Sequence, residues 1–256
     1  MEEPSVGKSQ FDVRKPEYLE TYDHFKDPAS FKQIAKIVEK HLGQKDRSSV
    51  RCLDSMAGTG LVGRNMQKLF PGIKVVYQDG SKHMLSSDAY GESDERVLSD
   101  ATAMSLNDKS FDIVFCRAGL NNVKEADYPR IIAEQLRVLN DDGIIILMDH
   151  FAQTEEERNV INQIENEVKR IEGIIDEVHV PTIENLRGLI EGVGGRVSDE
   201  QLSMVPFSMK KRFASKGIEK QDLSTFSKIL KAQNVLTFQE TEDDIVITYP
   251  IATIAF

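Results

Sequence analysis

The sequence has few of the features that mark secreted, membrane-spanning or nucleic-acid-binding proteins. Its two cysteines, Cys52 and Cys116, are too few for a disulfide framework or a cysteine-rich zinc site. Both lie in apolar runs, where a thiol is expected to be a small buried hydrophobe. Basic residues number 32 against 42 acidic ones, so the net charge of −10 disfavours non-specific binding to phosphate backbones. The composition therefore argues against a disulfide-stabilised secreted domain, a cysteine-rich zinc domain and a non-specific nucleic-acid-binding protein.

Long apolar segments are missing as well. No stretch approaches the ~18 consecutive apolar residues that a membrane span needs. The first fifteen residues are polar and lack the apolar region of a secretory signal. We therefore expect a soluble cytoplasmic protein with no membrane partner. Apolar residues still make up 40% of the 256, enough for one large domain or a domain with a cap.

An alternation of short apolar runs and helical patterns predicts an α/β fold. The expected strands are Val50–Leu53, Lys74–Gln78, Arg96–Leu98, Phe111–Cys116 and Ile144–Met148, and the expected helices are Leu61–Phe70, Ser81–Leu85 and Ala126–Leu139. Residues 140–143 read as a turn. Such alternation indicates a parallel sheet covered on both faces. Right-handed crossovers then place the loops that follow the strands at one edge, where ligands bind.

The flanking segments show a different pattern. Pro16 to Leu42 is predicted to be helical, with a break near Pro28, and Gly43 ends the helix. Beyond residue 150 the expected helices are Thr154–His179, Asn185–Gly192, Lys210–Lys216 and Leu223–Ala232, and the expected strands are Gly195–Pro206 and Ile245–Phe256. Pro250 within the last strand indicates an edge or a bulge.

The most informative segment runs from Val50 to Gly60 and consists of a strand, an acid and a glycine-rich turn before a helix. Gly58 to Gly63 also matches the dinucleotide fingerprint G-x-G-x-x-G. The position of Asp54 separates the two possibilities, because a carboxylate at the strand end would repel a pyrophosphate. It would attract a cation such as S-adenosylmethionine (SAM). Asp54 lies too far upstream for a usual helix N-cap.

Residues 52–60, Cys-Leu-Asp-Ser-Met-Ala-Gly-Thr-Gly, resemble the first motif of class I SAM-dependent methyltransferases without a gap. Met56 departs from this motif, since the family usually has a glycine there. The segments that follow are similar to the family's later motifs: residues 75–79, 80–85, 98–101, 110–117 and 137–147. The resemblance spans residues 46–150 and implies a Rossmann-like, doubly wound sheet of seven strands. Its last strand is expected to be antiparallel, and a mostly helical cap is expected beside the sheet.

The resemblance implies a role for each cofactor residue. Asp54 is expected to hold the amino group of the methionine end, Asp79 the ribose hydroxyls and Asp100 the adenine amino group. Met84 is expected to pack on the adenine. The full set of expected cofactor residues is Asp54, Met56, Ala57, Gly58, Gly60, Asp79, Gly80, Met84, Asp100, Ala101 and Arg117. Turn formation is an alternative role for Asp79, and N-capping is an alternative for Asp100.

The acceptor is expected beyond the fourth and fifth strands. His150 is the candidate general base, because an unperturbed imidazole titrates near pH 6.5; a hydrogen-bonded residue at a strand end is the alternative. Asn121 and Asn122 are candidate substrate contacts or a turn, and Tyr22 is a candidate for closing over the methyl group. The spacing of His, Cys and acidic residues indicates no metal site.

These residues predict methyl transfer from SAM to a small molecule. The expected divisions are an N-terminal helical cap segment over residues 1–45, a SAM-binding core over 46–150, and helical insertions with the last two strands over 151–256. Two alternatives remain: a SAM-binding protein without transfer, regulatory or cyclase-like, and a nicotinamide-dependent dehydrogenase. A nucleic-acid substrate is not expected, because no RNA-binding motif is present.

Charge in the last third divides into two opposed segments. Residues 154–179 hold eight acids and three bases, a net −5, and residues 207–232 hold seven bases and two acids, a net +5. They could form a lid held by complementary charge or a basic rim that recruits an anion. They could equally be two solvated helix faces.

Overall fold

The computed structural model describes residues 28–256 except 174–176, 214–217 and 234, and no helix within that part is long and apolar enough to cross a bilayer. Its strands are β1 (Arg51–Ser55), β2 (Lys74–Asp79), β3 (Glu95–Leu98), β4 (Phe111–Arg117), β5 (Leu139–Asp149), β6 (Asp199–Ser208), β7 (Thr237–Glu240) and β8 (Ile245–Ala255). Its helices are α3 (Pro28–Leu42), α4 (Leu61–Leu69), α5 (Lys82–Leu85), α6 (Tyr128–Val138), α7 (Glu155–Glu172), α8 (Ile183–Gly192), α9 (Met209–Arg212) and α10 (Lys220–Gln233). Short 3-10 turns are η2 (Arg47–Ser49), η3 (Leu120–Asn122) and η4 (Glu125–Asp127).

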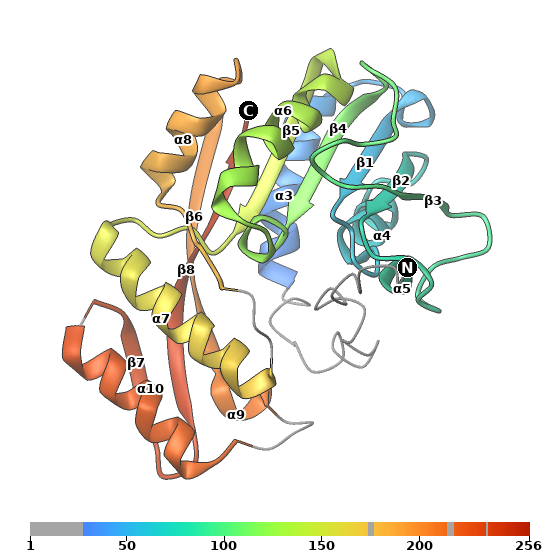
Figure 1. Cartoon of the computed structure of the whole chain (residues 1–256). Helices are drawn as coiled ribbons and strands as arrows, with labels where there is room; N and C mark the ends of the chain where they lie inside the picture. The colour runs from blue at the N-terminus through green and yellow to red at the C-terminus, as the bar shows by residue number, and fades with distance from the viewer. Residues whose placement is uncertain (1–27, 174–176, 214–217, 234) are drawn as a thin grey trace, which may run out of the picture.

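The described strands form one sheet in the order β3-β2-β1-β4-β5-β8-β6, with β7 also paired to β8 (Figure 1). The first five are mutually parallel, whereas β6 and β7 both run antiparallel to β8, and so does β5. This is the doubly wound α/β sheet expected from the sequence, with the carboxyl ends of β1, β2, β4 and β5 at one edge. The strand count differs: the described residues form eight strands, and Thr237–Glu240 is the one not expected.

Two hydrophobic cores lie on the opposite faces of the sheet. One includes Val38 of α3 and Met66 of α4, and the other includes Ile131 of α6 and Ile190 of α8. Alternate residues of the central strand face the two cores, Cys52 one and Leu53 the other, so β1 is buried on both sides. Both cysteines are buried free thiols, which confirms that prediction.

Strand β8 connects two parts of the molecule. Its residues 252–255 pair with β5, and residues 245–248 pair on the same side with β7, while β6 pairs along its other side. Pro250 lies between the β5-paired and β7-paired stretches, where the missing N–H leaves no ladder bond unmade on that side. Pro250 is therefore paired on one side only, which agrees with the edge position predicted for it, although β8 as a whole is an interior strand whose neighbour changes along its length.

Two further boundaries differ from expectation. Helix α7 ends at Glu172 rather than His179, because Gly173 adopts a left-handed conformation (φ 75°) and closes the helix with a bond to Arg170. Its start is as expected, with the Thr154 hydroxyl accepting from the Glu157 N–H at 3.2 Å. Residues 140–143, expected to form a turn, are the first part of β5, with a register shift between Phe111 and Ile113 on the neighbouring strand.

Candidate functional site

The turn between β1 and α4 approaches its neighbours too closely for most side chains. Gly60 has φ 74°, and a Cβ on it would lie 2.5 Å from Cε1 of Tyr90 and 2.9 Å from Cε1 of Tyr77. Gly58 has φ 56° but meets open space. Glycine is therefore required at position 60 by both conformation and contact, and at 58 by conformation alone.

Asp54 lies at the end of β1 beneath this turn. Its side chain is buried, and Oδ2 accepts a hydrogen bond of 2.8 Å from the N–H of Gly63 in the first turn of α4. Asp54 thus accepts a hydrogen bond from the N-terminal turn of α4, although we expected it to lie too far upstream to cap that helix. Burial raises its pKa to about 7. A cation placed beside it would favour the charged form.

Asp79 connects the end of β2 to the same turn. Its two carboxylate oxygens accept from the N–H of Gly58 at 2.7 Å and from the N–H of Ser81 at 2.8 Å. Burial raises its pKa, and the backbone hydrogen bonds oppose that shift. The bond to Ser81 is the turn role considered from the sequence; the bond to Gly58 shows that Asp79 also reaches the glycine-rich turn. Asp79 therefore contacts the glycine-rich turn, and Asp54, from the neighbouring strand, contacts the first turn of the helix that follows it.

Gln78 is a residue of this region that sequence reasoning missed. Its buried side-chain oxygen accepts from the Met56 N–H at 3.2 Å, and its nitrogen donates to the Ser99 carbonyl at 2.6 Å. It thereby joins the turn after β1 to the segment after β3. The available signal was a polar residue inside the apolar run Val-Val-Tyr-Gln-Asp. Met56 itself has φ 55°, so it adopts the left-handed conformation of the glycine that the family motif has there.

The expected adenine residues follow β2 and β3. Asp100 is exposed and accepts from the backbone and hydroxyl of Thr102 at 2.7 and 2.8 Å, which lowers its pKa. That arrangement is the capping alternative considered for it. Ala101 and Met84 are buried, and Met84 donates its N–H to the capping hydroxyl of Ser81 at 3.3 Å. Gly80, between β2 and α5, has open room, with the Ser99 carbonyl 3.8 Å from where a Cβ would lie.

The loops after β4 and β5 interact with each other. The Asn121 N–H donates to Oδ2 of Asp149 at 3.4 Å, and the Asn122 amide donates to the Ala118 carbonyl at 2.7 Å. Burial raises the pKa of Asp149 to about 7. Arg117 lies over the Phe31 ring, 5.4 Å from its centroid, and its charge opposes the rise in pKa at both Asp54 and Asp149. The asparagines are thus in a turn at the same edge as His150.

His150 is buried, 6% exposed, and directly follows β5. Its ring stacks on Tyr249 of β8 at 5.1 Å and meets Phe207 of β6 edge-on at 5.0 Å. Burial lowers its pKa to about 4, so the imidazole is neutral at pH 7. This pKa makes His150 a weaker base than an exposed histidine. Tyr22, the other acceptor-side candidate, lies outside the described residues.

A charged pair beside His150 was also missed from the sequence. Glu165 of α7 and Arg212 of α9 form two hydrogen bonds of 2.8 and 2.7 Å, with side chains only 9% and 10% exposed. Arg212 is foremost among the groups that lower the pKa of Glu165 to about 2 despite burial. The sequence did contain a signal for this pair. Two charged residues, Glu165 and Lys169, directly follow Ile164 and Val168 of the apolar stripe, which places them next to the buried face of the helix. The oppositely charged segments do contact each other here, and again through Arg170 and Asp222 at 3.2 Å.

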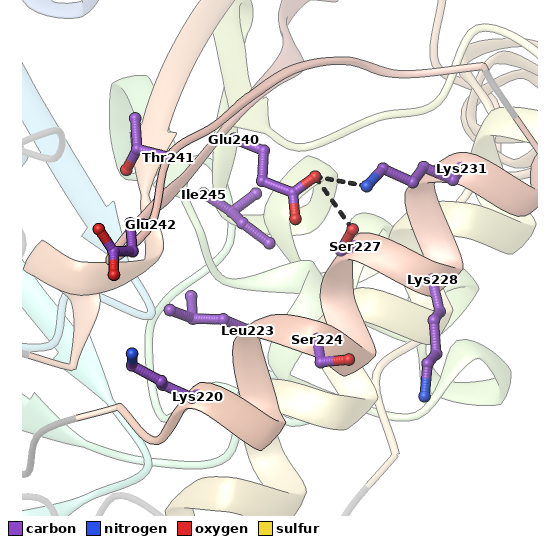
Figure 2. A pocket seen from close by; sticks show the side chains of 10 residues that line it. All are labelled: Lys220, Leu223, Ser224, Ser227, Lys228, Lys231, Glu240, Thr241, Glu242 and Ile245. Carbon is purple, nitrogen blue, oxygen red and sulfur yellow. Dashed lines mark hydrogen bonds and ion pairs between the residues drawn. The ribbon is translucent and has the colours of Figure 1, made fainter.

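A groove of about 450 Å³ lies between α10 and the turn that joins β7 to β8. Figure 2 shows the side chains that line it. Within it, Glu240 of β7 binds the Lys231 ammonium at 2.6 Å and the Ser227 hydroxyl at 3.1 Å. None of the residues expected to bind cofactor or acceptor lines this groove. The described residues also contain no cluster of three or more His, Cys, Asp or Glu suited to a metal ion.

Comparisons with known proteins agree with this geometry. Residues 53–147 match the family described as "Methyltransferase domain". The chain is 33% identical over 116 residues to the ubiquinone/menaquinone biosynthesis C-methyltransferase UbiE of Hahella chejuensis. That match covers 41% of this chain and 46% of UbiE, so the chain spans about half of that curated relative.

Solved structures with the same fold extend the likeness over most of the chain. YcgJ from Bacillus subtilis has a TM-score of 0.67 at 17% identity, covering 84% of this chain and 94% of its own. BH2331 from Bacillus halodurans has a TM-score of 0.70 at 18% identity, covering 90% and 97%. A phosphoethanolamine N-methyltransferase of Haemonchus contortus, solved with S-adenosyl-L-methionine, has a TM-score of 0.53 at 17% identity, covering 88% and 51%.

Proposed function

We propose that the protein is a class I SAM-dependent methyltransferase that transfers a methyl group from SAM to a small molecule and releases S-adenosylhomocysteine; the match of residues 53–147 to the family described as "Methyltransferase domain" supports this. One observation carries the proposal. Two acids at the ends of adjacent parallel strands, the buried Asp54 and the half-buried Asp79, converge on the glycine-rich segment from Gly58 to Gly63. In its charged form each carboxylate repels a pyrophosphate, and a cationic ligand beside it would favour that charged form against the effect of burial on its pKa.

The described side chains fit SAM in their donor chemistry. Asp54 is suited to the methionine-end ammonium, since a cation would compensate the cost of burying its charge. Asp79 is suited to the ribose hydroxyls and Asp100 to the adenine amino group. Met56, Ala57, Gly58 and Gly60 form the turn that approaches the cofactor, Gly80, Met84 and Ala101 line its adenosine side, and Arg117 completes this set beside Asp54 and Asp149. SAM supplies an electrophilic methyl on a sulfonium.

The chain's own contribution to transfer is to hold the acceptor in line with that methyl and to exclude water. Residues after β4 and β5, Asn121, Asn122 and His150, are proposed to contact the acceptor, together with Tyr22. The proposed divisions are a cofactor core over 46–150, a cap segment over 1–45 and a substrate-selecting part over 151–256. We further propose that the enzyme works in the cytoplasm on a small molecule rather than on nucleic acid.

The cofactor assignment is tested by replacing Asp79. Asp79→Ala is expected to weaken SAM binding by about 1.5–3 kcal/mol, the range for hydrogen bonds to a charged group. Titration calorimetry measures this, and Asp88→Ala, a nearby exposed acid, serves as the control. Unchanged SAM affinity in Asp79→Ala would falsify the ribose assignment.

Two measurements on the unaltered protein distinguish the alternative functions. Binding of NADH but not of SAM would favour a dehydrogenase. Binding of SAM with no labelled methyl group transferred to a metabolite extract would favour a SAM-binding protein without transferase activity.

A further inference from the structure

Gln78 lies on β2, the strand between β1 and β3 in the sheet (Figure 1). Its register partners are Ser55, the last residue of β1, and Val97, near the end of β3. The turn that follows β1 is expected to approach the methionine end of SAM, and the segment that follows β3 is expected to approach the adenine. A side chain at the carboxyl end of β2 can therefore reach both parts of the proposed cofactor site.

Backbone groups on two sides fix the orientation of the Gln78 amide. The Met56 N–H donates to Oε1 at 3.2 Å, and Nε2 donates to the Ser99 carbonyl at 2.6 Å. A backbone N–H can only donate and a carbonyl can only accept, so the reversed amide would lose both bonds. The side chain is 0% exposed, so a lost bond would leave a buried polar group without its partner. Each half of the amide therefore holds a different loop.

The oxygen acts on the residue that departs from the family motif. Met56 has φ 55°, a conformation that a residue with a side chain adopts only at a cost in free energy. The next N–H of the turn, that of Ala57, donates to the backbone carbonyl of Gln78 at 2.9 Å. Gln78 thus accepts from two successive N–H groups, one with its side chain and one with its backbone. These two bonds favour a conformation that glycine would adopt more readily.

The nitrogen acts on the segment after β3. The Ser99 N–H donates to the backbone carbonyl of Asp79 at 3.1 Å, and the Ser99 carbonyl accepts from the Gln78 amide. Consecutive residues of β2 therefore bind both backbone groups of Ser99. Asp100, proposed above to bind the adenine amino group, is the next residue, so these bonds determine where its backbone begins.

We propose that Gln78 is a positioning residue for both ends of SAM: its side-chain oxygen sets the Met56 turn beside the methionine end, and its side-chain nitrogen sets residues 99–100 beside the adenine. Gln78 acts through these loops rather than by touching SAM, because its side chain is buried and both ends of its amide are bonded. The inference rests on the proposed function, since it assigns a further residue to the same cofactor site.

Two substitutions separate the two halves of the amide. Gln78→Met keeps the length of the side chain and removes both bonds. Gln78→Glu keeps an acceptor for the Met56 N–H but, when ionised, repels the Ser99 carbonyl. The probes are S-adenosylhomocysteine, which has both ends, and adenosine, which has the adenine end alone. Neither has a net charge that a new carboxylate would attract, and calorimetry at pH 8.5 measures both affinities.

The two variants are expected to change the two affinities in different proportions. Gln78→Glu is expected to weaken adenosine and S-adenosylhomocysteine at least fivefold and to the same extent, because the change is on the adenine side. Gln78→Met is expected to weaken S-adenosylhomocysteine at least threefold more than adenosine, because the Met56 turn is released as well. Unchanged affinities, or losses that are equal for the two probes in both variants, would overturn the inference.

A change of pH gives a result that general damage to the fold would not give. When protonated, the carboxyl introduced by Gln78→Glu has a donor for Ser99 and an acceptor for Met56, as glutamine has. Burial favours that protonated form. Adenosine affinity relative to the unaltered protein is therefore expected to recover to within twofold at pH 5.5; Asp54 and Asp79 titrate in both proteins and cancel in this ratio. A ratio that is the same at pH 5.5 and 8.5 would contradict the role of the nitrogen.

Gln135→Met is the matched control. Gln135 of α6 is also a glutamine with 0% exposure, but its nitrogen donates to the Ser55 hydroxyl at 3.5 Å rather than to either loop. Both affinities are expected to stay within twofold in this variant, and losses equal to those of Gln78→Met would overturn the inference. Failure of the unaltered protein to bind S-adenosylhomocysteine would count against the proposed function, whereas binding that both Gln78 variants retain counts against the positioning role alone.

Discussion

The two halves of the chain each bury a carboxylate, and the two carboxylates behave in opposite ways. Asp54, in the proposed cofactor core over residues 46–150, has a pKa raised to about 7 by burial, with a backbone N–H as its bonded partner. Glu165 in the second half is equally buried, yet its pKa falls to about 2 because Arg212 binds it with two hydrogen bonds. The presence of a cationic partner, rather than burial, decides the charge of each acid. One half leaves an acid ready for a cationic ligand, whereas the other uses its acid to hold helices together.

The difference has consequences for stability against pH. The folded state binds the Asp54 proton more tightly than the unfolded chain does, so its contribution to stability decreases as pH rises from about 3.8 to 7. Glu165 has a depressed pKa, so its contribution is complete above about 4.5 and is lost as pH falls towards 2. The neutral burial of His150 adds a loss between pH 6.5 and 4. Acid therefore weakens the second half and favours the first.

The largest expected effect comes from breaking the buried pair. Glu165→Ala leaves the Arg212 charge buried without its carboxylate and is expected to lower the free energy of unfolding by about 3–5 kcal/mol. Glu167→Ala, on the same helix, is the matched control, since its partner Arg170 is 62% exposed; the expected loss is about 1 kcal/mol or less. Urea unfolding measures both. Similar losses in the two variants would contradict the contrast between the halves.

The next effect tests how closely packed the cofactor turn is. Gly60→Ala combines a left-handed backbone with a Cβ at 2.5 Å from Tyr90, and is expected to cost about 2–4 kcal/mol of stability. Gly58→Ala has the same backbone conformation but open space, so we expect about 1–2 kcal/mol. Thermal unfolding compares them. An equal cost at both positions would mean that conformation alone, without contact, requires glycine here.

The third effect concerns cofactor affinity. If the SAM ammonium requires Asp54 ionised, each binding event releases a proton whenever Asp54 begins protonated, and SAM affinity rises with pH between 5.5 and 7, by at most about tenfold per unit. Calorimetry across this range measures the slope. Asp54→Asn is expected to flatten it, and Asp149→Asn, which removes a second buried carboxyl with a pKa of about 7, is expected to retain it. A slope that persists in Asp54→Asn would assign the linked proton elsewhere.

The smallest effect compares two strained residues. Lys109 and Met56 have φ of 48° and 55°, a conformation that costs a residue with a side chain about 1–2 kcal/mol. Lys109→Gly is expected to stabilise the protein by about 0.5–1 kcal/mol, because Lys109 is exposed and makes only a surface ion pair with Asp141. Met56→Gly is expected to gain less, since its thioether packs close to Gly119. Chemical denaturation distinguishes them, and a larger gain at Met56 would show that this packing contributes little.

Local patterns were sufficient for much of the cofactor half. The apolar runs around Cys52, Val75 and Ile113 predicted strands because strands buried on both faces need continuous apolar residues. The glycines of the turn after β1 and the acid that ends β2, Asp79, were likewise predicted from residues a few positions away. The ion pair between Glu165 and Arg212 was not predicted. The two residues are 47 positions apart, and no local sequence pattern indicates that α7 packs against α9.

The sequence by itself therefore determined the alternating α/β order, the glycine-rich turn and the acids that end its strands, since each depends on neighbours a few residues away. Only the tertiary structure decided the protonation of those acids, the change of neighbours along β8, and the enclosure of His150 by Phe207 and Tyr249. Burial and long-range pairing set these properties. Both depend on which distant segments meet when the chain folds. The net charge of −10 does not indicate which of the charged residues become buried or paired.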